Sequence, residues 1–184
     1  ASALIPEFHR QIVGVRGWLT DADFAHMVAL AQVAPHIGIY VLSFVYAGIY
    51  WNNHHHLFQA VKNVNGAVLW SNLHLLFWLS LTPFTSGWMG ESHFAPLPVA
   101  AYGGALLMCG LAYTILVRAL IAHNGKDSLL ARAIGSDAKG WASLALYAAG
   151  IASALVMPLL SVGFYAVVAA MWLVPDRRIE RVIH

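Results

Sequence analysis

Long apolar runs separated by short polar segments dominate the chain. The four longest runs lie at residues 24–51, 66–88, 97–121 and 141–174. A helix needs about 20 mainly apolar residues to cross a bilayer, so each of the first three runs predicts one spanning helix. The fourth run holds 34 residues without a charge and has Pro158 near its middle, which favours two shorter helices joined by a tight turn. The pattern therefore predicts an all-α protein, a polytopic transmembrane helix bundle with five spans.

The polar segments divide the chain into three parts. Residues 1–23 carry charges that interrupt every window long enough to span a membrane, so we expect an extramembrane or interfacial segment. The transmembrane bundle is expected over residues 24–175, followed by a basic cytoplasmic tail at 176–184. Within the bundle, residues 124–139 have the composition of a hydrophilic loop with room for a short surface helix.

Composition agrees with a membrane protein. Hydrophobic residues make up 60% of the chain, charged residues only 10%, and the mean hydropathy is +0.67. The net charge of +2 gives no reason to expect a nucleic-acid partner. The single cysteine, Cys109, excludes an intrachain disulfide, and its place in an apolar run predicts a small buried core residue.

Basic residues fall unequally on the two sides that five helices would define. One side receives two, Arg10 and Arg16, and the other receives eight. The eight are Lys62, Arg118, Lys126, Arg132, Lys139, Arg177, Arg178 and Arg181. Because cytoplasmic segments carry an excess of Lys and Arg, the C-terminus is predicted to be cytoplasmic and the N-terminus external. One further N-terminal helix would place both ends inside, so the tally leads us to expect a truncated chain.

Polar side chains inside predicted spans are costly and therefore informative. The main ones are His36 and Ser43 in the first run and Asn72 and His74 in the second. Hydrogen bonding between neighbouring helices is the favoured role for such residues, and no cofactor is expected. The alternative is a membrane electron carrier that binds haem between His36 and His74. An absorption spectrum distinguishes the two, because a colourless protein removes the haem alternative.

Three consecutive histidines stand in the stretch YWNNHHHLF, residues 50–58. Successive helical residues point about 100° apart, so His54, His55 and His56 do not converge on one ion, and no metal site is expected. Imidazoles change charge near neutrality, which makes pH sensing by these residues a reasonable hypothesis.

Several kinds of chemistry lack the residues they need. All eight acidic residues fall outside the predicted spans, which argues against a carboxylate-driven transporter or proton pump. Phosphate-binding glycine loops and nucleophile elbows do not occur in the sequence. We therefore expect a protein that is not an enzyme.

Two stretches carry a family resemblance. SFVYAGIYWNNHHHLF, residues 43–58, and NLHLLFWLSLTPFTSGWMGE, residues 72–91, resemble the bacterial transmembrane protein 175 family of potassium channels. The pattern is Ser-Phe, Trp-x-x-His-His-x-Leu-Phe, Asn-Leu-His and Pro-Phe, and the resemblance covers roughly residues 25–181. It implies a homotetrameric potassium channel of the bacterial inner (plasma) membrane, which conducts potassium ions across the lipid bilayer.

The resemblance also implies six helices, with a pore lined by a first helix that begins Arg-x-x-x-Phe-Ser-Asp. No Phe-Ser-Asp occurs in this sequence, so the chain is expected to be truncated and not to conduct alone. The alternative is an unusual N-terminus that substitutes for the pore helix, and the pore-lining residues are unknown. A structural membrane protein without conduction is a further alternative. By resemblance, Trp51, His55 and Asn72 are the foremost candidates for the interhelical network that holds the pore helix. The wider candidate set, with possible pH sensing, is Ser43, Trp51, His54, His55, Asn72 and His74.

Overall fold

The computed structural model describes residues 20–173 of the chain. Every regular element in this range is an α-helix, which confirms the all-α fold class. The helices are α2 (Asp21–Gln59), α3 (Gly66–Glu91), α4 (Pro96–Asn124), α5 (Leu129–Ile134), α6 (Ala138–Ala154) and α7 (Pro158–Leu173). The expectations for most of the N-terminal segment and for the basic tail at 176–184 fall outside the described residues.

The helices contain the apolar runs and extend a few residues beyond several of them, with the longest extension at the end of α2. Pro158 begins α7, so the long uncharged run is divided where its proline predicted. The short helix α5 lies inside the hydrophilic segment at 124–139. Helix α2 continues past Trp51 to Gln59, because the polar residues there contain no glycine or proline to end it.

Two of the described helices are long and apolar enough to cross a membrane, α3 with 26 residues and α4 with 29. Helix α7 is apolar but shorter, with 16 residues. Local sequence explains where α4 begins and ends. Pro96 and Pro98 stand in its first turn, where the missing N–H costs little, and Gly125 follows its last residue with a φ of 95°.

The chain divides into two compact units, residues 1–38 and 39–184, and each is described by itself. In the first unit, the described residues form the beginning of α2. The Thr20 hydroxyl oxygen accepts a hydrogen bond of 3.2 Å from the backbone N–H of Asp23, and the same hydroxyl donates to the Asp23 carboxylate over 2.6 Å. These contacts satisfy one of the free N–H groups at the start of the helix.

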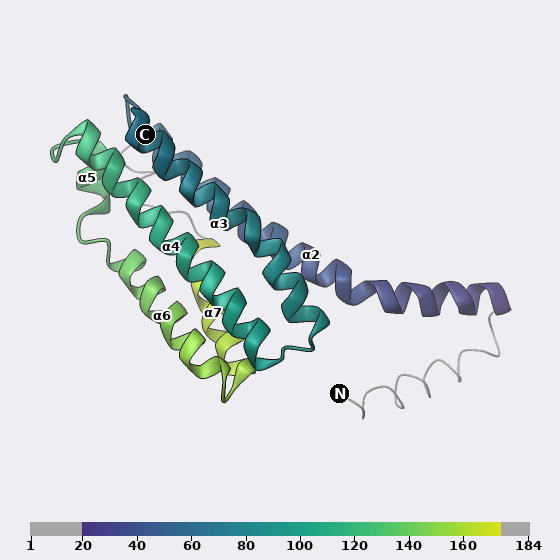
Figure 1. Cartoon of the computed structure of the whole chain (residues 1–184). Coiled ribbons are helices and arrows are strands. Elements are labelled where there is room, and N and C mark those ends of the chain that lie inside the picture. The colour runs from purple at the N-terminus through teal and green to yellow at the C-terminus, as the bar shows by residue number, and fades with distance from the viewer. Residues whose placement is uncertain (1–19, 174–184) are drawn as a thin grey trace. The chain divides into compact units, whose positions relative to one another are not determined.

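In the second unit, α4 lies at the centre of the packing. It contacts α3, α6 and α7, and α6 packs in turn on α7 (Figure 1). Gly103 and Gly150 allow the closest approach, because a methyl group at either position would overlap the Tyr165 side chain. Cys109 is fully buried in α4, which confirms the expectation from sequence.

Candidate functional site: polar contacts between helices

Two polar contacts join α2 to α3. The Ser43 and Ser86 hydroxyl oxygens lie 2.5 Å apart in a buried position. The His54 Nε2 and Asn72 Oδ1 atoms lie 2.7 Å apart in a half-buried position. The later residue of α2, His54, contacts the earlier residue of α3, Asn72, so the two helices run antiparallel. At 1.5 Å per residue, the two contacts are separated by roughly 16 Å along α2.

Three of the expected site residues thus make contacts between α2 and α3: His54 with Asn72, and Ser43 with Ser86, a residue that the sequence analysis did not select. Sequence reasoning preferred His55 as the partner of the network, but the histidine beside Asn72 is His54. A step of one residue turns the side chain about 100° around the helix, so only one of these two neighbours reaches α3. Ser86 follows Pro83 in α3 and donates a second contact of 3.1 Å to the Pro83 carbonyl oxygen.

Trp51 and His55 form a separate contact on the surface of α2. Their rings are stacked, with centroids 5.4 Å apart and an angle of 8° between the planes. Trp51 is 68% exposed, and His55 is exposed as well. The four-residue spacing places both side chains on one face of the helix, away from the contact with Asn72. This aromatic pair is therefore available to lipid or to another polypeptide.

His74 makes its contact within its own helix. Its Nε2 accepts a hydrogen bond of 2.9 Å from the Trp78 indole, one helical turn further along α3. The side chain of His36, the other residue of the haem alternative, lies outside the described part of the structure. Among the described residues, no three His, Cys, Asp or Glu side chains gather closely enough to hold a metal ion.

Asn53 is a polar contact that the sequence analysis did not select. Its side chain is only 4% exposed and donates to the Trp172 carbonyl oxygen of α7 over 3.1 Å. Its own carbonyl oxygen accepts a 3.4 Å hydrogen bond from the Tyr113 hydroxyl of α4. Spacing was the available signal, because Asn53 continues the series of buried α2 residues that recur every three or four positions. The series is Ser43, Tyr46, Ile49, Asn53 and Leu57.

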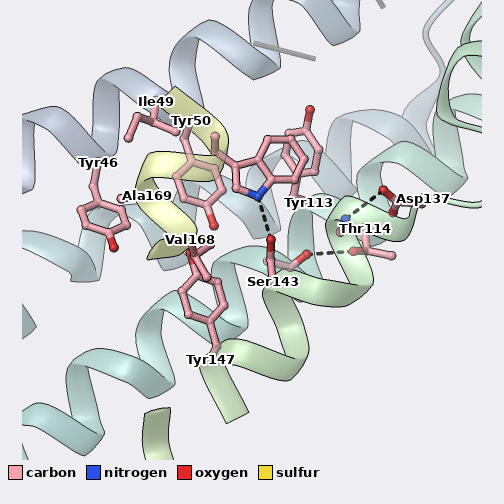
Figure 2. Close-up of a pocket in the computed structure, with 13 residues that line it drawn as sticks. Tyr46, Ile49, Tyr50, Tyr113, Thr114, Asp137, Ser143, Tyr147, Val168 and Ala169 are labelled. Atoms are coloured by element: carbon pink, nitrogen blue, oxygen red, sulfur yellow. Dashed lines mark hydrogen bonds between the residues drawn. The ribbon is translucent and has the colours of Figure 1, made fainter. Parts of the chain in front are cut away.

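A cavity of about 40 Å³ lies between α2, α4, α6 and α7. Tyr46, Tyr50 and Tyr147 line it, and Figure 2 shows their rings around the same space. The Trp172 indole N–H closes one side by donating to the Ser143 hydroxyl oxygen over 2.8 Å. The volume suffices for a water molecule, and the hydroxyl groups supply polar partners. The cavity can therefore hold a water or another small hydrogen-bonding molecule.

The sequence of this chain is similar to those of known proteins. The family described as endosomal/lysosomal potassium channel TMEM175 matches residues 12–83. This range includes Ser43, His54 and Asn72 and ends before Ser86. A protein named a potassium channel from Chryseobacterium sp. is 52% identical over 153 residues, covering 83% of this chain and 80% of that protein. Another so named, from Streptomyces collinus, is 32% identical over 95 residues, covering 48% of this chain and 45% of that protein.

No solved structure matches this chain. The similarity to the Chryseobacterium protein extends over most of both chains and is far above the level that shared composition would produce. The chain therefore belongs to the TMEM175 family of potassium channels.

Proposed function

We propose that this chain is a subunit of a potassium-permeable cation channel in the inner membrane of a bacterium. The observation that carries the proposal is the 52% identity with a protein named a potassium channel, over four fifths of that protein. A channel selects ions through the groups that line its pore and needs no chemical reaction. In this proposal, the contacts Ser43–Ser86 and His54–Asn72 join α2 to α3 beside the pore.

The proposal includes an assembly of several copies, a tetramer by family resemblance. Large apolar side chains that are exposed on α2 and α3 support a further partner or lipid on those helices. They include Tyr40, Phe44, Trp70, Phe77 and Phe84. Native mass spectrometry of the purified protein tests this part, because a monomer at all detergent concentrations would contradict it.

We also propose five membrane spans with the C-terminus in the cytoplasm. Single cysteines placed in a Cys109→Ala background test the orientation. Ser92→Cys precedes α4 and Ser136→Cys follows it, so the two positions lie beyond opposite ends of a helix that this proposal assigns as a span. A membrane-impermeant thiol reagent added to intact cells should label position 92 and spare position 136. The reverse labelling would show that the orientation is inverted.

Potassium flux tests the function itself. Protein isolated from its own cells and reconstituted in liposomes should release potassium down a gradient, and a carrier ionophore gives the full signal. The 184-residue chain is predicted not to conduct selectively by itself, because it lacks Phe-Ser-Asp. No flux from the native gene product would remove the channel proposal. A selective current from the 184-residue chain would refute only the prediction that this chain does not conduct by itself.

A further inference from the structure

A pocket of about 490 Å³ lies where the α2–α3 connection meets the α4–α5 connection. Asn124 joins the two segments, because its side chain accepts from the Asn63 N–H over 3.3 Å and donates to the Asn63 carbonyl oxygen over 3.0 Å. Beside it, the Asn65 Nδ2 and His123 Nδ1 atoms lie 3.1 Å apart. The pocket is therefore fixed by hydrogen bonds between two segments that are distant in sequence.

The walls of this pocket are both cationic and apolar. Lys62 and Arg132 contribute positive charges from the two segments, and Asp127 contributes one negative charge. Within residues 20–173, neither Lys62 nor Arg132 makes an ion pair. The Ser128 hydroxyl oxygen accepts from the Ala131 N–H over 3.3 Å, which leaves its own hydrogen available to a ligand. Leu129, which is 43% exposed, supplies an apolar wall.

The position of the pocket indicates which anions can reach it. Helix α4, which is apolar enough to span a membrane, ends at Asn124 on the edge of the pocket. Arg118 lies 5.8 Å from the ring centroid of Trp141, which is 56% exposed, so an exposed tryptophan marks the same end of α4. Exposed tryptophans gather at the level of lipid headgroups. When α4 spans the bilayer, this end of the helix and the pocket beside it reach the lipid phosphates.

We propose that this pocket binds the phosphate diester of an anionic phospholipid. Lys62, Arg132 and the Ser128 hydroxyl would contact the phosphate oxygens, and Leu129 would lie against the beginning of an acyl chain. Two cations opposed by one carboxylate leave an attraction for a singly charged headgroup, and basic pockets between membrane helices are suited to such groups. The volume falls within the range of about 300–1,000 Å³ typical of small-molecule sites.

The test titrates the full chain in neutral detergent with phosphatidylglycerol and counts bound lipid by native mass spectrometry. Saturable binding is expected, with phosphatidylcholine much weaker. Since one basic residue near a lipid surface contributes roughly a five-fold change in affinity, Lys62→Gln with Arg132→Gln should weaken binding by about 25-fold. Lys126→Gln removes an exposed charge from the same connection outside the pocket, and should change affinity less than two-fold.

Two further variants protect the test against misfolding. Asp127→Asn removes the negative charge and should strengthen lipid binding several-fold, a gain that an unfolded protein would not give. Lys62→Arg keeps the positive charge and should bind the lipid as wild type does. An equal loss in Lys126→Gln and the double variant would show only diffuse surface attraction, and would overturn the proposal. Inorganic phosphate serves as the second probe. If it stabilises the protein against heat as strongly as the lipid, and Lys62→Gln removes that effect, the occupant is free phosphate and the lipid assignment is wrong.

Discussion

The His54 imidazole lies 2.7 Å from the Asn72 side-chain oxygen, and this contact ties the end of α2 to the beginning of α3. The distance joins Nε2 to Oδ1, so Nε2 carries the hydrogen and donates it. The imidazole donates through Nε2 in one neutral tautomer and in the charged form alike. Protonation of His54 is therefore compatible with the contact.

We predict that His54 and Asn72 are energetically coupled. In a double-mutant cycle of His54→Ala and Asn72→Ala, unfolding in detergent should show a coupling free energy of about 0.5–1.5 kcal/mol. The matched control pairs His55→Ala with Asn72→Ala, and these two effects should add. A cycle in which His55 couples to Asn72 and His54 does not would show that α2 is rotated relative to the present structure.

We predict that the packing of α4 on α7 depends on glycine at position 103. A methyl group there would overlap the Tyr165 side chain, so Gly103→Ala should destabilise the protein by about 1–3 kcal/mol. Gly104→Ala is the control, since nothing lies within 4 Å of a methyl group at that position. It should leave the thermal unfolding temperature unchanged or slightly raised. Equal losses in the two variants would contradict the close approach.

We predict a specific role for the Trp172 indole N–H beside the cavity. Trp172→Phe keeps an aromatic ring but removes the 2.8 Å hydrogen bond to Ser143, and should lower the free energy of unfolding by about 1 kcal/mol. In a Ser143→Ala background, the same change should cost less. Trp88→Phe is the control, because the Trp88 indole makes no hydrogen bond among the described residues. If Trp88→Phe proves as costly, the loss comes from ring size and not from the hydrogen bond.

We predict that His55 changes the fluorescence of Trp51. The two rings are stacked, with centroids 5.4 Å apart, so the imidazole covers one face of the indole. At a fixed pH, His55→Gln should change the intensity or the wavelength of the Trp51 emission, because it removes this ring. Trp51→Phe identifies the Trp51 part of the spectrum, and His56→Gln is the matched control, which should leave that part unchanged. The same Trp51 emission in wild type and His55→Gln would contradict the stacking.

The hypothesis of pH sensing in the channel has its own test. Replacement of His54, His55 and His56 with glutamine should reduce the dependence of potassium flux on pH. The side-chain amide of glutamine can donate a hydrogen bond, so glutamine at position 54 can replace the imidazole in the contact with Asn72. A flux response that is the same in wild type and triple variant would dispose of the hypothesis.

The positions of the helices were determined by the sequence itself. Apolar runs of sufficient length favour helices in a membrane, and Pro158 cannot continue the preceding helix, so α3, α4, α6 and α7 follow local rules. The resemblance in YWNNHHHLF and the following Asn-Leu-His likewise depends only on the order of residues. That order was enough to indicate the family.

Only the tertiary structure decided which side chains meet. Three consecutive histidines are equivalent in sequence, and the rotation of α2 about its axis is set by the packing of Tyr46, Asn53 and Leu57 on other helices. That rotation turns His54 toward Asn72 and His55 toward the surface. The pocket beside Lys62 and Arg132 likewise combines residues from two distant connections, and helical periodicity within one segment carries no information about such a meeting.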